Sequence, residues 1–295
     1  MRSRKEIQAG DESTNIQDSE NVTVTNTHNY GVTYADARQI ALDVFKANFY
    51  ELSEAAKATA VERAEQLVNN LMAKIQSQAP ESISKIQYPD VQYAVVNAQK
   101  HYARSGNTDS LNLLTDLLKD RFLMDEGSLK AIILNEAIEV LPKLTINQIK
   151  IICTIFLVKN VKLPKARLLI DNVSQFLFDH GIHAADNLQF YEHLLFVGVA
   201  AHDNLVSAEQ NLEYFIRKNY KHELNYASEG PNRGKEDPPV INQFIIDDIS
   251  RDAFNKWNNS FAKRYVLTSV GIAIAVAYYN AEKGANIDLG IWIKE

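Results

Sequence analysis

The side chains best suited to chemistry gather in one stretch past the middle of the chain. Imidazole and carboxylate groups bind zinc or iron when three of them converge and hydrogen bonds orient them. In "HGIH", however, the first two histidines fall across an expected helix end, and no His-Glu-x-x-His pair is present. We therefore expect no bound metal, and we keep His180, His183 and His193 as an alternative site. The full stretch contains His180, His183, His193, His202, Asp179, Asp186, Glu192 and Asp203.

Three further sets of residues could carry chemistry. Asp247 and Asp248 in "FIIDDISRD" could bind magnesium as in a nuclease, but adjacent carboxylates are common on a solvated helix. Cys153 lies within the apolar run "IKIICTIFLV", which indicates a core position. Trp257 and Trp292 could stack against a ligand, although packing is the commoner role. No phosphate-binding loop or nucleophile elbow occurs, so we expect no nucleotide hydrolysis by those routes, assign no catalytic residue and predict no cofactor.

Composition narrows the class of protein. The 295 residues are 46% hydrophobic and 23% charged, which is typical of a globular chain, and only 11 Gly and 7 Pro disfavour an all-β fold. A net charge of −6 disfavours nucleic-acid binding. The most apolar stretch, residues 265–279, is shorter than the ~20 residues that span a bilayer. No signal peptide follows Met1, so we predict a cytoplasmic, mainly α protein without a membrane span.

The first 32 residues differ from the rest of the chain. "NVTVTNT" alternates in the manner of a strand, but its side chains are too small to form a core by themselves. Its asparagines suit ladders between identical chains, so we predict a β-rich segment that forms a homo-oligomer. The alternative is a disordered tail. The residues predicted to associate are Ile16, Val22, Thr23, Val24 and Thr25.

Residues 33–229 are predicted to form a helical domain. A long helix follows Ser53 and carries an apolar stripe that would suit a partner helix or the body of the same chain. Thr145 with Gln148, and Ser207 with Gln210, form capping boxes that predict two further helix starts. The stripe consists of Ala60, Ala64, Leu67, Leu71 and Ile75.

Residues 240–295 are predicted to form a separate C-terminal unit after the polar loop at 227–239. "RYVLTS" predicts a strand ending at Thr268, which would cap a buried helix that stops at Gly284. "NIDLGIWIKE" alternates as a second strand would. Strand, helix and strand in this order resemble the end of a winged-helix unit.

Several segments together resemble an uncharacterised bacterial protein family of about 290 residues. They are "GDESTNIQ", "YADARQIALDVFKANFYELSEAA", "YPDVQYAVVNAQKHYARSG" and "LTSVGIAIAVAYYN" with "IDLGIWIK". The GDxSTNIQ-type opening is also similar to that of proteins associated with antiphage defence, and the last segment resembles the ends of abortive-infection-type domains. The resemblance implies a role in defence and carries over no catalytic residue.

Our leading hypothesis is a non-enzymatic, homo-oligomeric scaffold or sensor that meets a protein partner from the same defence system. The first alternative is an effector enzyme, such as a metal-dependent nuclease or a nucleotide hydrolase. The second is a winged-helix regulator that reads DNA through residues 240–295.

Overall fold

The computed structural model describes residues 53–79, 82, 85–86, 88–178, 187–203, 210–224 and 244–294. The chain divides into two units, Met1–Lys57 and Ala58–Glu295, and the account below concerns the second. The mainly α class predicted from sequence is confirmed, with one small sheet near the C-terminus. The predicted boundaries, at residue 32 and between residues 229 and 240, lie outside the described residues.

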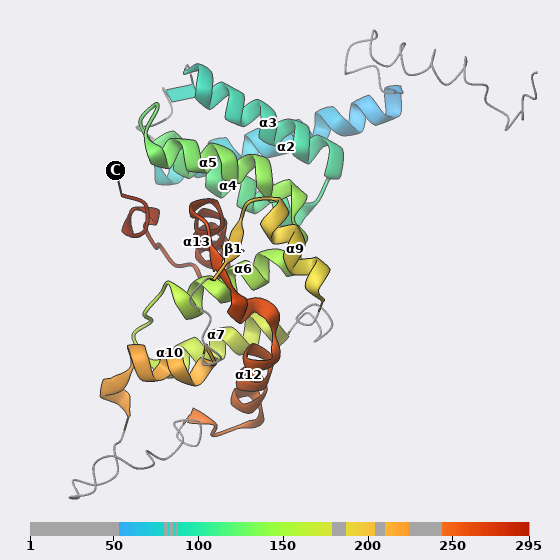
Figure 1. Cartoon of the computed structure of the whole chain (residues 1–295). Helices are drawn as coiled ribbons and strands as arrows, with labels where there is room; N and C mark the ends of the chain where they lie inside the picture. The colour runs from blue at the N-terminus through green and yellow to red at the C-terminus, as the bar shows by residue number, and fades with distance from the viewer. Residues whose placement is uncertain are drawn as a thin grey trace, which may run out of the picture. The chain divides into compact units, whose positions relative to one another are not determined.

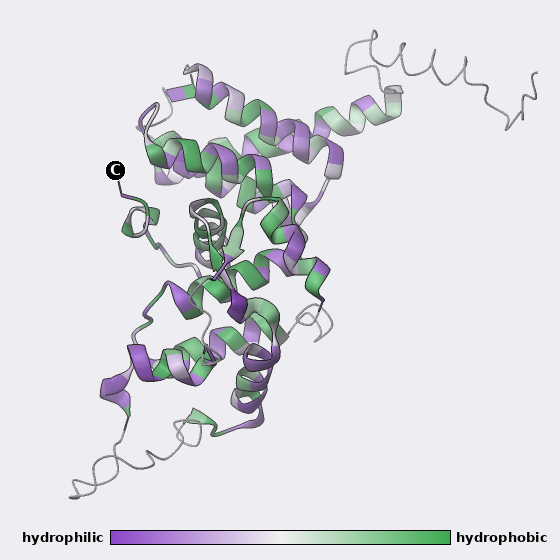
Figure 2. Cartoon of the chain, viewed as in Figure 1, coloured by the Kyte–Doolittle hydropathy of each residue, from purple (hydrophilic) through white to green (hydrophobic). Residues whose placement is uncertain are grey.

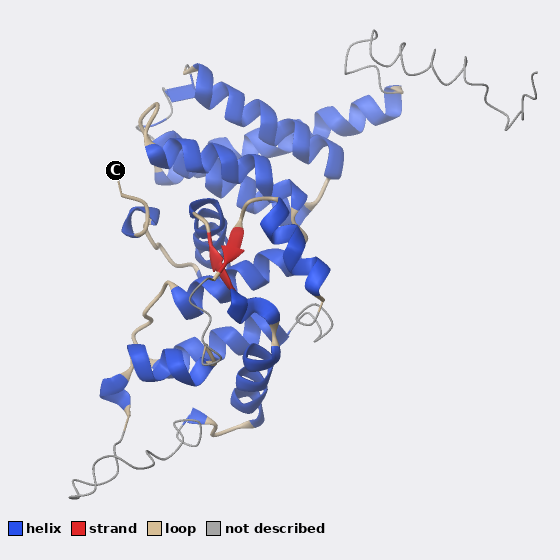
Figure 3. Ribbon diagram, viewed as in Figure 1, coloured by secondary structure: helices blue, strands red, loops and turns tan. Residues whose placement is uncertain are grey.

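Helices dominate the chain order (Figures 1 and 3). The α-helices are α2 (Glu54–Gln78), α3 (Pro89–Ser105), α4 (Thr108–Leu123), α5 (Leu129–Val140), α6 (Ile146–Lys159), α7 (Ala166–Phe178), α9 (Leu188–Phe196), α10 (Leu212–Asn219), α12 (Asp248–Asn259) and α13 (Ser269–Lys283). Short 3-10 helices are η2 (Leu141–Lys143), η3 (Lys221–Glu223), η4 (Phe261–Arg264) and η5 (Leu289–Ile291). The two strands are β1 (Ala200–His202) and β2 (Tyr265–Leu267).

Polar residues define many of the helix starts. The predicted capping box of α6 is confirmed, since Thr145 accepts from the Gln148 amide and the Gln148 side chain accepts in return from the Thr145 amide. α2 begins directly after Ser53, as the sequence predicts. α10 begins at Leu212 behind an Asn211 cap and not behind Ser207 as the sequence predicts; Ser207 itself lies outside the described residues. Other helices start behind Asn107, Ser128, Asn187, Asp247 and Thr268.

Two apolar helices, α6 and α13, pack on each other at the centre of the second unit. α4 and α5 also pack on α13, and α3 packs on α4 and α5; on the other side α7 packs on α6, with α12 on α7 and α10 on α12 (Figure 1). α13 is buried on nearly all faces, as the sequence predicts. The outer helix α12 instead carries a hydrophilic face, shown in purple in Figure 2. None of the described helices combines the length and the apolar character that crossing a membrane requires.

The sheet joins segments that are distant in sequence. β1 pairs antiparallel with β2, with Ala200 opposite Leu267 and His202 opposite Tyr265 (Figure 3). The strand before α13 and the Thr268 cap are thereby confirmed, whereas its partner β1 was not predicted. The start of α13 approaches this sheet closely, because a Cβ on Gly271 would lie 2.0 Å from the Val199 carbonyl oxygen. Glycine is required at that contact.

The strand predicted after α13 is wrong. Residues 289–291 form η5, because the Asp288 carboxylate accepts from the Gly290 amide and starts a tight turn. The alternation of apolar residues has another cause: Ile293 is buried, and the Trp292 indole N–H donates to the Asn160 carbonyl oxygen at 3.1 Å. From Tyr265 the chain is therefore strand, helix and 3-10 turn, and residues 284–294 do not form the second strand that the winged-helix resemblance needs.

Candidate ligand-binding pocket

A polar pocket of about 910 Å³ lies where α2, α4, α5 and the C-terminal end of α13 meet the segment that follows α13. Pockets that hold small molecules are commonly of this size. Its apolar floor includes Leu134 and Ala277, which are both buried. Its polar lining consists of Lys74, Gln78, Asn112, Asp116, Lys119, Asp120, Lys130, Asn280, Asn286 and Asp288.

Helix periodicity places the α4 residues in this pocket. Asn112, Asp116 and Asp120 recur at intervals of four, so they share one face of the helix. The opposite positions, such as Leu114 and Leu118, are buried in the core. α4 therefore separates the core from the pocket and carries a row of polar groups on its outer side.

Two ion pairs occupy this polar row. The Lys74 ammonium lies 2.6 Å from Asp116 and donates to the Asn112 carbonyl oxygen at 3.2 Å, while Lys119 lies 2.9 Å from Asp120. All four charged side chains are less than one-third exposed. Burial raises the pKa of the Asp120 carboxyl, and the neighbouring Lys119 ammonium offsets this only in part. Keeping the Asp120 carboxyl ionised in the pocket therefore lowers the stability of the folded protein.

The segment after α13 closes one side of the pocket. Asn280 on α13 holds it in place, donating to the Ile287 carbonyl oxygen at 3.0 Å and accepting from the Ile287 amide at 2.9 Å. At Gly290, a Cβ would lie 2.8 Å from the Lys130 ammonium and 3.1 Å from the Asp288 carboxylate. Glycine therefore allows these two charged groups to approach the same point of the backbone.

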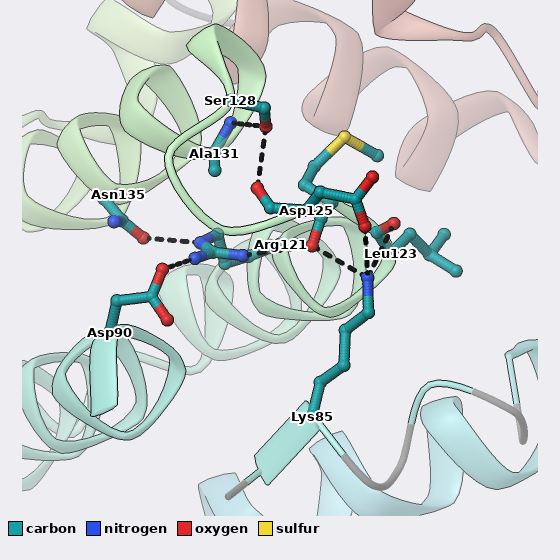
Figure 4. A network of polar contacts seen from close by, with 9 residues as sticks. Lys85, Asp90, Arg121, Leu123, Asp125, Ser128, Ala131 and Asn135 are labelled. Atoms are coloured by element: carbon teal, nitrogen blue, oxygen red, sulfur yellow. Dashed lines mark hydrogen bonds and ion pairs between the residues drawn. The ribbon is translucent and has the colours of Figure 1, made fainter. Parts of the chain in front are cut away.

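A buried arginine fixes the far end of α4, beside the pocket (Figure 4). Arg121 is fully buried; its guanidinium pairs with the Asp90 carboxylate and donates to the Asn135 side-chain oxygen at 3.0 Å. Lys85 donates to the carbonyl oxygen of Met124, which lines the pocket, at 2.9 Å. These contacts tie α3, α4 and α5 together and hold the α4–α5 turn in position.

A second buried charge cluster lies apart from the pocket, where α6 meets the sheet. The Lys159 ammonium donates to the Asp203 carboxylate at 2.9 Å, to the Gln210 side-chain oxygen at 2.8 Å and to the Lys263 carbonyl oxygen at 2.7 Å. Desolvation lowers the pKa of Lys159, and the bond to Asp203 opposes this shift. Gln210 also donates to Asp203 at 2.9 Å. Because every donor of Lys159 has a protein acceptor, the cluster acts as a structural crosslink.

The two candidate histidines that the structure describes, His193 and His202, contact other side chains of the fold. His193 Nδ1 lies 2.9 Å from the Gln148 side-chain nitrogen, and the His202 ring stacks on Tyr265 with centroids 5.3 Å apart. Within the described part of the chain, no group of three His, Cys, Asp or Glu side chains could hold a metal ion. His180 and His183, the other members of the alternative metal site, lie outside the described residues, as do Ile16, Val22, Thr23, Val24 and Thr25.

The two adjacent carboxylates do not converge. Asp247 caps α12 by accepting from the Ser250 amide at 2.8 Å, and it pairs with Arg167 at 2.8 Å; these bonds, led by those from Ser250, lower its pKa to about 2. Asp248 instead pairs with Arg251 on the exposed side of the helix. Their positions are those of a helix cap and a surface ion pair.

The remaining candidate residues lie in the core or pack against it. Cys153 is fully buried, as predicted, and burial raises the pKa of its thiol. Trp257 is fully buried and donates to the Gln210 carbonyl oxygen at 3.1 Å, while Trp292 packs edge-on against Phe156. Trp257 therefore presents no stacking surface for a ligand, whereas Trp292 is partly buried against the core.

The polar pocket was missed at the sequence level. Its only local signal is the spacing of Asn112, Asp116 and Asp120 within the otherwise apolar run "LNLLTDLLKDRFL". That pattern also fits an ordinary solvated helix face. The residues that complete the pocket come from distant segments.

The fold and the pocket together define a helical protein with a small antiparallel sheet and a polar pocket of ligand size. A protein-family model matches residues 31–252 and 231–293, and the chain belongs to that family, which is uncharacterised. No curated protein and no solved structure matches the chain. The predicted membership of an uncharacterised family is thus confirmed, whereas the link to antiphage defence and the GDxSTNIQ-type segment stay predictions.

Proposed function

We propose that this chain is a non-enzymatic scaffold or sensor that self-associates in the bacterial cytoplasm and meets a protein partner in antiphage defence. The observation that supports self-association is the apolar stripe of α2. The similarity of the opening and closing segments to defence-associated proteins supports the setting.

The stripe is fully covered at one end of α2 and only partly covered at the other. Leu67, Leu71 and Ile75 are fully buried in the core, whereas Ala60 and Ala64 on the same face are only partly buried. Val61, beside them, is 49% exposed. The apolar stripe of α2 therefore extends toward the start of the helix, beyond the part that the core buries.

Contacts with α3 show where the covering ends. Arg63 donates to the Ala103 carbonyl oxygen near the end of α3, and Gln66 accepts from the Tyr102 hydroxyl at 2.8 Å. α2 begins at Glu54, so it has more than two further turns before Arg63. Short helical segments without tertiary packing are only marginally stable in water. A second copy of α2 would cover this face and stabilise the exposed turns.

Light scattering of the full chain tests the proposal. We expect a mass that is a multiple of 33.3 kDa, and a shift toward 33.3 kDa for Ala60→Glu, which places a charge on the stripe. Ala58→Glu is the matched control, because Ala58 is exposed on another face of the same helix. Glutamate is a good helix former, so both variants should retain α2. A wild-type chain of 33.3 kDa, or equal losses in both variants, would contradict the proposal.

A further inference from the structure

Basic side chains gather where the loop between α6 and α7 meets the end of α10 and η3. They are all exposed, and none of the lysines among them forms an ion pair within the described part of the chain. We call this set the basic surface; it consists of Lys162, Lys165, Lys218, Lys221 and His222.

Two hydrogen bonds between distant segments assemble the basic surface. The Leu163 amide donates to the Tyr220 hydroxyl at 3.0 Å, and the Ala166 amide donates to the Glu223 carboxylate at 3.1 Å. A lysine directly precedes each donor, and the two residues between the acceptors are a lysine and a histidine. The fold therefore brings to one junction basic groups that are far apart in the sequence.

The acidic groups near this junction do not neutralise it. Glu213 lies 2.9 Å from Arg217, and Glu223 is engaged by the Ala166 amide and lies 3.6 Å from the imidazole of the histidine in the set. Arg167 already pairs with two aspartates. Residues 225–243, outside the described residues, carry three acidic and two basic side chains in sequence, a net charge of −1. The four lysines thus leave a net positive charge.

We propose that the basic surface binds the phosphate backbone of single-stranded nucleic acid, with Tyr214 as a platform for one base. The proposal goes beyond the scaffold function and does not depend on self-association. Tyr214 on α10 is 41% exposed, and the Lys218 ammonium lies 5.9 Å from its ring centroid. An aromatic ring beside several cations is the combination with which proteins hold single strands, by stacking and by charge.

The exposed aromatic ring distinguishes this partner from other anions. An acidic protein segment would be attracted by the same lysines but would give Tyr214 no role, and a duplex keeps the faces of its bases stacked inside. The net charge of −6 does not oppose local binding. At physiological ionic strength, charges beyond a Debye length of about 8 Å are largely screened, so the groups at the junction decide the local potential.

Fluorescence anisotropy of the full chain tests the inference, with a labelled oligodeoxythymidine of about 15 nucleotides as the probe. Four lysine contacts predict that the logarithm of the binding constant falls against the logarithm of salt concentration with a slope of about −3. Lys162→Gln combined with Lys221→Gln should weaken binding and reduce that slope by about half. The matched control is Lys100→Gln combined with Lys143→Gln, which removes two exposed lysines outside the basic surface.

A second variant separates stacking from charge. Tyr214→Leu should weaken binding about fivefold or more and leave the salt slope unchanged, because it removes a stacked ring and no charge. Leucine is a good helix former, and circular dichroism should confirm that each variant keeps its helices.

Three results would overturn the inference. The oligonucleotide does not bind at micromolar protein and about 50 mM salt, where phosphate contacts are strong. The control pair of lysines weakens binding as much as the pair in the basic surface does. A duplex, a poly-glutamate peptide or vesicles of phosphatidylserine compete at least as well as the single strand.

Discussion

Removing the Arg121 guanidinium should lower the free energy of unfolding more than any surface substitution does. Arg121 is fully buried and pairs with one oxygen of the Asp90 carboxylate, while the other oxygen is buried without a hydrogen-bond partner. In Arg121→Met the apolar stem is replaced, but Asp90 loses its counter-charge and Asn135 loses a donor. Breaking a buried ion pair from one side costs about 3–5 kcal/mol. We expect the lower part of that range, because Asp90 also lies in the first turn of α3, where the helix dipole stabilises a carboxylate.

Urea unfolding at pH 7, followed by circular dichroism, measures this loss. The double variant Arg121→Met with Asp90→Asn should be more stable than Arg121→Met alone, because it no longer holds an uncompensated carboxylate. Lys85→Gln is the control: its partner Asp125 is 94% exposed, and such pairs contribute at most about 1 kcal/mol. A loss below about 1 kcal/mol for Arg121→Met, or a double variant that is no more stable than the single one, would refute the assignment of Arg121 as a buried crosslink.

Three further predictions concern other parts of the molecule. Gly271→Ala should lower the free energy of unfolding by about 1–3 kcal/mol despite alanine's better helix propensity, because the new Cβ meets the Val199 carbonyl oxygen; thermal unfolding checks this. Asp120→Asn should stabilise the protein at pH 7 but not at pH 3, because the raised pKa of Asp120 makes the free energy of unfolding fall as the pH rises above about 4. The uncharged amide removes that loss. Urea unfolding at the two pH values measures the effect, and an equal effect at both would contradict the prediction. Replacing Val22 and Val24 by Pro should weaken the oligomer in light scattering while helical circular dichroism persists, since proline removes ladder donors; an unchanged assembly would show that these residues do not pair.

Local signals in the sequence were sufficient for most of the helical architecture. The capping box at Thr145, the cap at Thr268 and the stop at Gly284 act through hydrogen bonds and backbone conformations within a few residues, so they can be read without knowledge of the fold. Burial of α13 and of Cys153 followed in the same way from continuous apolar runs. The fold class was predictable because these effects are local.

Long-range pairing decided the rest. β1 exists only because β2, more than sixty residues later, supplies its hydrogen bonds, and three residues carry no strand signal of their own. The alternation after Gly284 indicated a strand, but contacts of Trp292 with α6 and the turn at Asp288 produced a 3-10 helix. The pocket likewise joins Lys74, Lys130 and Asp288 from three distant segments, and only the packing of α2, α4, α5 and α13 brings their charges together.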